Sequence, residues 1–149
     1  MNITVHKALK SDISILQKYI LEIEQYHLDL SDFLIKNNND VNDEYFFNKH
    51  IVSYLIKNED VTIGFYRVQL NKKPNFTKGS VLFIDPIYII KKFRNKGIGK
   101  KIITEIEDFA KSNNYVNIML NVWSFNENAT SFYSKNGFEN LRETKIKTI

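Results

Sequence analysis

The sequence of 149 residues contains no cysteine. This absence excludes disulfide bonds, thiolate metal ligands and a thiol nucleophile, and it fits a reducing compartment. The three histidines, His6, His27 and His50, lie too far apart in the sequence to form a local metal motif. We therefore expect no metal site.

Long apolar runs are also missing. The longest, Val81 to Ile90, contains Asp85 and is half as long as a membrane span requires. The first residues lack the charged start, apolar run and small-residue cleavage site of a signal peptide. We therefore predict a cytoplasmic protein with no membrane segment. The length suits one domain, so we assign residues 1–149 to a single domain.

Positive charge is concentrated in one short segment. The whole chain is only mildly basic, with 21 Lys and Arg against 17 Asp and Glu, which by itself does not indicate nucleic-acid binding. Six of the eleven residues from Lys91 to Lys101 are basic and none is acidic. Two glycines, Gly97 and Gly99, lie where this segment joins an apolar run to a helical pattern.

A glycine-containing turn of this kind exposes backbone N–H groups at the positive end of a helix, where they can bind a phosphate or pyrophosphate. The simpler alternative is a strand-to-helix turn that carries solvated lysines. The residues required by a nucleotide P-loop or by a dinucleotide fingerprint do not occur at the necessary positions. The hypothesis for this loop is therefore an anionic ligand that is neither an NTP nor NAD.

Hydrophobic periodicity predicts an ordered series of helices and strands. We expect a helix opening at Ser11 or Asp12, a short helical piece over 45–50, a hairpin of 51–56 and 61–70, a buried strand over 81–90, a helix over 97–112, a strand over 115–122, a helix over 124–136 with a capping box of Ser124 and Glu127, and a last strand pair within 138–149.

This order predicts an α/β fold with a mixed, mostly antiparallel sheet flanked by helices. The strand–helix–strand order in the second half requires one parallel pair joined by a right-handed crossover. Pro86 interrupts the central strand of that pair and cannot donate a ladder hydrogen bond. It therefore predicts a bulge, or a place where the neighbouring strand separates.

Two motifs occur in order in this half of the chain. The loop RNKGIG begins at Arg94, and the helix NENATSFYSKNGF begins at Asn126. They resemble the RxxGxG/A loop and the NxxAxxFYxxxGF helix of the Gcn5-related N-acetyltransferase (GNAT) family. The resemblance covers about residues 51–142. It implies a GNAT-like acyl-CoA N-acyltransferase fold with one splayed parallel strand pair, and the transfer of an acetyl group from acetyl-CoA to a primary amine of a small molecule or peptide.

The resemblance also implies a set of residues that bind acetyl-CoA. The amides of Asn95 to Lys100 would hold the pyrophosphate, the backbone of Ile87 to Ile89 would bind the pantetheine arm, and Asn126 would bond that arm or a bridging water. The implied cofactor-binding residues are Ile87, Tyr88, Ile89, Arg94, Asn95, Lys96, Gly97, Ile98, Gly99, Lys100, Asn126 and Ala129.

Two residues are candidates for catalysis. Tyr133 corresponds to the family's tyrosine that protonates the departing thiolate, although a tyrosine on an amphipathic helix can simply pack in the core. Asp85 is the leading candidate for the base, because a carboxylate within an apolar run should hold a proton more strongly. It could instead act through a water, bind a cationic acceptor or bond local backbone. Tyr88 and Glu44 are weaker candidates for the base.

The acceptor itself is not identified by the sequence. The acidic segment Glu22–Asp32 suggests a cationic acceptor, although a solvated helix end explains it as well. His27 could line the acceptor entrance or pack in the core. Trp123 could form a wall of the pocket or simply pack.

A second class of function stays open. It is a non-catalytic, CoA-responsive or nucleic-acid-binding module that docks through Lys91 to Lys101. We prefer the enzyme and expect no nucleic-acid partner. By resemblance, a homodimer could form through a strand at 144–149.

Overall fold

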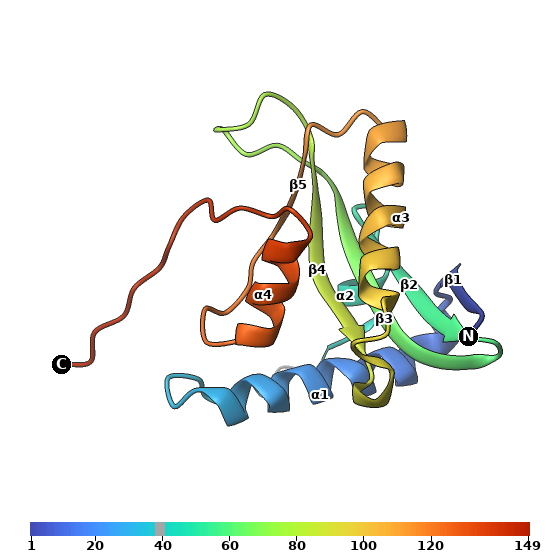
Figure 1. Cartoon of the computed structure of the whole chain (residues 1–149), viewed down its shortest axis with the longest axis horizontal. Coiled ribbons are helices and arrows are strands. Elements are labelled where there is room, and N and C mark those ends of the chain that lie inside the picture. The colour runs from blue at the N-terminus through green and yellow to red at the C-terminus, as the bar shows by residue number, and fades with distance from the viewer. Residues whose placement is uncertain (38–40) are drawn as a thin grey trace.

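The computed structural model describes residues 1–37 and 41–149. Its five strands form one sheet in the order β1-β2-β3-β4-β5, antiparallel except for the parallel pair β4–β5 (Figure 1). The elements are β1 (Ile3–Lys7), a 3₁₀ turn (Lys10–Asp12), α1 (Ile13–Leu30), α2 (Asp43–Phe46), β2 (Ile51–Asn58), β3 (Val61–Lys72), β4 (Val81–Ile89), a 3₁₀ turn (Lys91–Phe93), α3 (Ile98–Ser112), β5 (Asn117–Leu120) and α4 (Glu127–Lys135). The predicted fold class is confirmed.

Helices cover both faces of the sheet. The apolar stripe of α3 packs with residues of β2, β3 and β4 on one face, where Ile102 is completely buried. On the other face, Leu16 and Tyr19 of α1 and Phe46 of α2 pack with Phe65 and Tyr88. Because β3 and β4 are covered on both sides, their runs are apolar at almost every position rather than at alternate ones.

The two parallel strands part halfway along β4. They are paired from Val81 opposite Asn117 to Ile84 opposite Leu120, and the pairing stops there. The register between β3 and β4 also shifts at this point, between Tyr66 and Val68. Both effects that we predicted for Pro86, a bulge and a separation, therefore occur together.

Several predicted boundaries differ from the structure. β1 was not predicted, because five residues ending in His6 and Lys7 carry too little apolar pattern to stand out from a loop. The helical piece predicted over 45–50 is α2, which begins earlier because the Asn42 side chain accepts a hydrogen bond from the Tyr45 N–H. The expected capping box is wrong, since the cap of α4 is Asn126, two residues beyond Ser124.

The predicted strand pair within 138–149 is also wrong. The 138–149 segment, which follows Gly137, contains no strand, and Figure 1 shows it running away from the sheet. A strand needs a neighbour to receive its backbone hydrogen bonds. None of the strands that the structure describes pairs with this segment. The predicted strand at 144–149 is therefore absent.

No helix in the described part of the chain has both the length and the apolar character needed to cross a membrane.

A glycine in β3 sets how closely β4 approaches. A Cβ built on Gly64 would lie well inside contact distance of the Tyr88 carbonyl oxygen, a backbone atom that cannot move aside without shifting β4. We expect Gly64→Ala to lower the free energy of unfolding by about 1–3 kcal/mol. Val61→Ala, in the same strand at a side chain 60% exposed, should change it by about 0.5 kcal/mol or less. Urea unfolding measures the free energy of unfolding of both variants. Equal losses of stability would show that β4 shifts to make room for the added methyl group at no cost in free energy.

Candidate functional site

A wide groove opens where β4 and β5 part. Its volume is about 3070 Å³, and β4, the start of α3, α4 and the second half of α1 all contribute to its lining. Apart from the weaker candidate Glu44, all but two of the residues predicted from the sequence line it: Asp85, Ile87, Tyr88, Ile89, Arg94, Asn95, Gly97, Gly99, Lys100, Asn126, Ala129 and Tyr133.

The two exceptions are Lys96, in the loop before α3, and Ile98, the first residue of α3. The side chain of Ile98 is in the core, where the residue is only 3% exposed. Lys96 is exposed outside the groove, with its ammonium 5.5 Å from the centre of the Phe93 ring. Ile98 can therefore offer a ligand its backbone N–H but not its side chain.

The loop before α3 presents unpaired backbone donors. Asn95 and Gly97 have positive φ angles of 59° and 79°, which turn the chain sharply into the helix. Within the described residues, no carbonyl accepts from the N–H groups of residues 95–100, and the first N–H that is bonded belongs to Lys101, whose acceptor is the Gly97 carbonyl at 3.1 Å. These donors, at the positive end of α3, form an anion-binding site.

Arg94 is tied down beside this loop. Its Nε donates to the Ile89 carbonyl at 2.6 Å, and its guanidinium lies 5.5 Å from the centre of the Tyr88 ring. Its charge therefore has a fixed place next to the end of β4, whereas Lys100 is exposed on the first turn of α3.

The two sequence motifs meet at one contact. A Cβ built on Gly99 would lie 2.9 Å from the Phe132 ring, so the first turn of α3 can pack against α4 only because residue 99 has no side chain. The anion-binding loop is thereby held at a fixed distance from α4, which carries Tyr133.

Asn126 connects α4 to α1 across the groove. Its Oδ1 accepts from the Ala129 N–H at 3.2 Å, and its Nδ2 faces His27 Nε2 at 3.4 Å. Because the amide Nδ2 is a donor, His27 must present a lone pair at Nε2. Burial lowers the pKa of His27, which favours this neutral form. The sequence pattern had left the role of His27 open.

Tyr133 has its hydroxyl available in the groove. The ring packs edge-on against Phe132 and Phe138, with centroids 5.2 and 5.5 Å away, and the hydroxyl makes no hydrogen bond to any described residue. Burial first, and then the negative charge of Asp85, raise the pKa of Tyr133 to about 12. The hydroxyl is therefore protonated at neutral pH and can donate.

Tyr88 is bonded to α1. Its hydroxyl donates to the Glu22 carboxylate, and burial together with this bond raises the pKa of Tyr88. A phenol that stays protonated does not act as a base at neutral pH. Glu44, the other weak candidate, is not among the groove residues.

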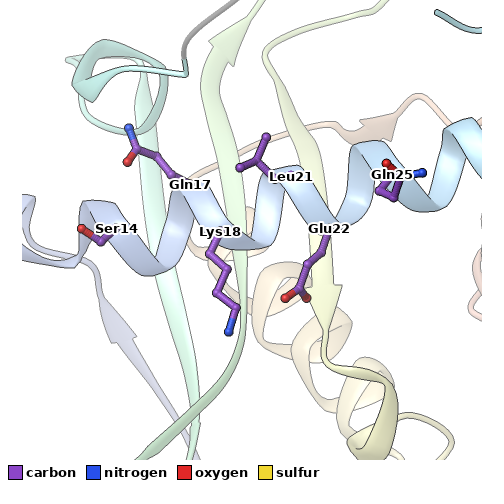
Figure 2. Close-up of a pocket in the computed structure, with 6 residues that line it drawn as sticks. All are labelled: Ser14, Gln17, Lys18, Leu21, Glu22 and Gln25. Carbon is purple, nitrogen blue, oxygen red and sulfur yellow. The ribbon is translucent and has the colours of Figure 1, made fainter. Parts of the chain in front are cut away.

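A second hollow lies on the outer face of α1 and has a volume of about 490 Å³ (Figure 2). It is lined by residues of this one helix, and it contains none of the residues predicted to act in catalysis or cofactor binding. We therefore place the site in the groove. The residues of the hollow are Ser14, Gln17, Lys18, Leu21, Glu22 and Gln25.

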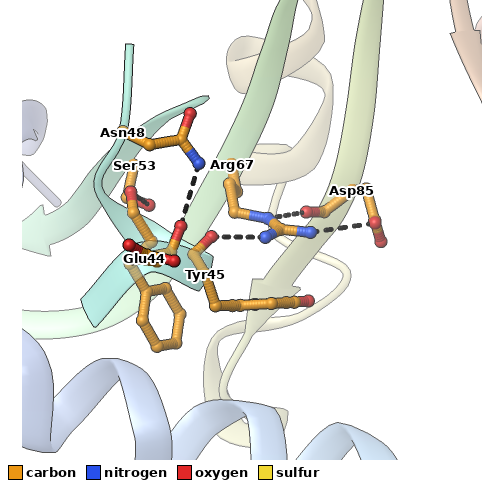
Figure 3. A network of polar contacts seen from close by, with 7 residues as sticks. Glu44, Tyr45, Asn48, Ser53, Arg67 and Asp85 are labelled. Atoms are coloured by element: carbon orange, nitrogen blue, oxygen red, sulfur yellow. Dashed lines mark hydrogen bonds and ion pairs between the residues drawn. The ribbon is translucent and has the colours of Figure 1, made fainter. Parts of the chain in front are cut away.

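Asp85 is held by a buried arginine (Figure 3). Arg67, whose side chain is 8% exposed, donates to Asp85 Oδ2 at 3.0 Å and to the Asp85 carbonyl at 2.6 Å. It also donates to the Tyr45 carbonyl at 2.5 Å and lies 3.5 Å from the centre of the Tyr45 ring. The Asp85 side chain is itself 58% exposed and lines the groove. We expected the Asp85 carboxylate to lie in apolar surroundings. In the structure it instead forms an ion pair with Arg67.

Arg67 was not among the residues predicted from the sequence. The sequence nevertheless marks Arg67 as unusual, because it is the only charged residue between Val61 and Leu70, in a strand that is otherwise largely apolar. A charge at such a position needs a partner, although the pattern does not say which one.

Comparison with known proteins gives the class of protein. The model of the acetyltransferase (GNAT) family matches residues 18–138. The chain therefore belongs to this family, as the two motifs indicated.

The chain is similar to curated relatives and to solved structures. An uncharacterized N-acetyltransferase from the pepI 3′ region of Lactobacillus delbrueckii subsp. lactis is 28% identical over 91 residues, which is 60% of this chain and 53% of that protein. The match thus spans about half the length of this relative. The tetramutant of the BH1408 protein from Bacillus halodurans has a TM-score of 0.86 at 19% identity, over 98% of this chain and 99% of that one.

The other two structures share the fold at lower similarity. AAC(6′)-Iy in complex with a CoA-containing bisubstrate analogue has a TM-score of 0.73 at 15% identity, over 100% and 99% of the chains. A ribosomal-protein-alanine N-acetyltransferase from Brucella melitensis biovar Abortus 2308 has a TM-score of 0.76 at 16% identity, over the whole of both chains.

The contact between His27 and Asn126 is testable by NMR. We expect the His27 ring to titrate below its ordinary pKa of about 6.5 and to carry its proton on Nδ1 above that pKa, because Nε2 must accept. Falling pH would then put two donors face to face and break the contact. Long-range ¹H–¹⁵N spectra of the imidazole report tautomer and pKa, with Asn126→Ala as the control that removes the partner amide. A neutral ring protonated on Nε2 would contradict the assignment.

Proposed function

We propose that the protein transfers an acetyl group from acetyl-CoA to a primary amine by direct attack in a ternary complex. One observation carries this proposal. The unpaired N–H groups before α3, the part of β4 that β5 leaves, and the hydroxyl of Tyr133 all open onto the same groove.

The residues of the groove suit acetyl-CoA from one end to the other. The N–H groups of residues 95–100 bind the pyrophosphate, with Arg94 and Lys100 adding positive charge. Beyond Ile84, the backbone of Ile87 to Ile89 faces the gap and can bond the amides of the pantetheine arm, as an added strand would. Asn126 and Ala129 lie on the opposite side of this arm.

The chemistry proposed for the groove is acyl transfer without a covalent enzyme intermediate. The amine nitrogen attacks the thioester carbonyl, a C–N bond forms and the C–S bond breaks. A strand amide near Ile87 stabilises the oxyanion. The amine loses one proton and the sulfur gains one, so the protons balance.

Tyr133 acts on the departing sulfur. With a pKa of about 12, it is a weaker acid than an ordinary thiol, whose pKa is about 8.5. Complete proton transfer to a free thiolate is therefore uphill. Its main contribution is a hydrogen bond that strengthens as charge develops on sulfur, a kind of interaction that typically supplies about 10²–10³ in rate.

Asp85 is proposed to receive the amine. Its ion pair with Arg67 fixes the carboxylate at the groove wall, and Oδ1 makes no hydrogen bond to a described residue. That oxygen can bind an ammonium group and take up its proton, directly or through a water. Similar folds include an aminoglycoside acetyltransferase and a ribosomal-protein-alanine acetyltransferase, so both small-molecule and peptide acceptors remain in the proposal.

Calorimetry with acetyl-CoA tests the cofactor site. We expect acetyl-CoA to bind, and S-acetyl-pantetheine, which lacks the pyrophosphate, to bind at least about 10-fold more weakly, since each charge-assisted hydrogen bond contributes about 1.5–3 kcal/mol. No response to millimolar acetyl-CoA would remove the proposal. Salt-sensitive binding of duplex DNA, unaffected by CoA, would support the nucleic-acid module instead.

Replacement of Tyr133 tests the catalytic assignment. We expect Tyr133→Phe to lower kcat about 10²-fold while the Kd for acetyl-CoA stays within about twofold, because the hydroxyl acts on the sulfur only as the bond breaks. Tyr115→Phe is the matched control, since its hydroxyl bonds Asn71 and does not line the groove. CoA release measures both rates once an amine screen has given an acceptor. An unchanged kcat would leave Tyr133 as a packing residue.

A further inference from the structure

The groove has an apolar wall on the side of α1 and α2. Ile20 and Ile23 of α1 line the groove, together with Val41 before α2 and Tyr45 within it. All four side chains are half-buried, and they pack on the core cluster between these helices and the sheet. One core cluster therefore supports an apolar surface on this side of the groove.

Carboxylates are sparse on this wall. Among the groove residues of α1, α2 and β4, only Glu24 and Asp85 carry one. Glu24 Oε1 accepts a hydrogen bond from the Asn37 N–H at 2.7 Å. The neighbouring Glu22 accepts from the Tyr88 hydroxyl and does not line the groove. The acidic end of α1 therefore does not offer a row of carboxylates to a molecule with several positive charges.

Tyr45 presents a phenol beside Asp85. The Arg67 guanidinium lies over the Tyr45 ring, 3.5 Å from its centre, and the Phe46 ring packs edge-on at 4.9 Å. Figure 3 shows the hydroxyl end of the ring pointing toward the strand that carries Asp85. This hydroxyl makes no hydrogen bond to a described residue. The ring is thus held in place while its oxygen is available to a ligand in the groove.

The charges around this phenol act in opposite directions. Burial raises the pKa of Tyr45, the Arg67 charge lowers it and the Asp85 charge raises it again. The influence of Asp85 agrees with the proximity of the two side chains, and the raised pKa keeps the phenol protonated at neutral pH.

We propose that the acceptor is a primary amine with one positive charge and an apolar or aromatic body, and that Tyr45 helps to select it. This inference rests on the proposed transferase function. The ammonium group donates to Asp85 Oδ1 and to the Tyr45 hydroxyl oxygen. The body of the amine lies against Ile20, Ile23 and Val41.

A second positive charge in the body has no free carboxylate beside it on this wall. An ammonium group placed against aliphatic side chains loses its hydration without gaining a hydrogen bond. An alkyl chain in the same place leaves water, which strengthens binding roughly fourfold for each buried methylene. The wall therefore favours an amine that is charged at one end only over a polyamine or an aminoglycoside.

The length of the acceptor tests the apolar wall. We expect kcat/KM to rise from ethylamine to hexylamine, by about fourfold for each methylene that is buried. Ile23→Ala should lower the hexylamine-to-ethylamine ratio about fivefold or more, because it removes part of the wall. A loss of folded protein does not change this ratio. Leu21→Ala, at a side chain 59% exposed on the outer face of the same helix, should leave it unchanged. Equal kcat/KM along the series would overturn the proposal.

A second charge at fixed length tests the selection against polycations. 1,6-Diaminohexane has the same carbon chain as hexylamine, and we expect its kcat/KM to be about 10-fold lower. A diamine that is as good a substrate as hexylamine, or a better one, would contradict the proposal. If Glu24→Gln then removed the activity on the diamine, the second ammonium group would be assigned to Glu24.

Replacement of the phenol tests the role of Tyr45. We expect Tyr45→Phe to raise KM for hexylamine about 10-fold, since a hydrogen bond to a charged group is lost. Its kcat and the Kd for acetyl-CoA should stay within about twofold. Tyr54→Phe is the matched control, because Tyr54 stacks on Tyr66 with ring centroids 4.8 Å apart and does not line the groove. An unchanged KM in Tyr45→Phe would leave Tyr45 with a structural role only.

Two aromatic amines separate the sources of this chemistry. Phenethylamine represents a free amine and phenylalanylglycine the N-terminus of a peptide, and the better substrate of the two identifies the source. Preferred acetylation of spermidine or neamine would overturn the apolar acceptor and keep the transferase. No CoA release with any of these amines, by a protein that binds acetyl-CoA, would contradict both proposals.

Discussion

The parting of β4 and β5 after Ile84 is the constraint on which the groove depends. Pro86 has no N–H to contribute to a ladder, so an unbroken parallel pair cannot continue through it. The Asp85 carbonyl next to the proline nevertheless has a donor, because the Arg67 guanidinium donates to it from the neighbouring strand. The same guanidinium bonds the Tyr45 carbonyl of α2, so the bulge in β4 is fixed from two sides. The opening is therefore a built feature of the sheet rather than a frayed end.

The groove has a defined electrical polarity. Unpaired N–H groups at the start of α3 make one part of it positive, and the exposed carboxylate of Asp85 makes another part negative. Tyr133 belongs to α4, which contacts the start of α3 through Phe132 and Gly99. Burial first, and then the charge of Asp85, raise the pKa of Tyr133. This polarity would favour a molecule with an anionic head and a neutral reactive tail lying with its head at the start of α3. This polarity agrees with a cationic acceptor that meets a polyanionic cofactor.

The features that could be predicted from the sequence are those with a local signal. Three such features are the apolar stripe of α3, the glycines of the loop before it and the proline in β4. Each is visible within a few residues of sequence, and each predicted the local structure that forms there. The polar pairs of the site could not be found in this way. Arg67 with Asp85, Tyr88 with Glu22, and His27 with Asn126 are 18, 66 and 99 residues apart. Such partners are determined only when the sheet and helices have packed, and a sequence pattern shows at most that a buried charge needs one.

The failed prediction of a strand at 144–149 has a different cause. Side-chain composition does favour a strand there, but a strand is a property of two paired segments, whereas a helix satisfies its own backbone. The stretch from Ile118 to Leu120 shows the converse: it forms a strand because it meets β4 after the α3 crossover. Within residues 1–37 and 41–149, the segment 144–149 pairs with no strand of its own molecule. The local preference for a strand is therefore not sufficient without a neighbouring strand to receive its backbone hydrogen bonds.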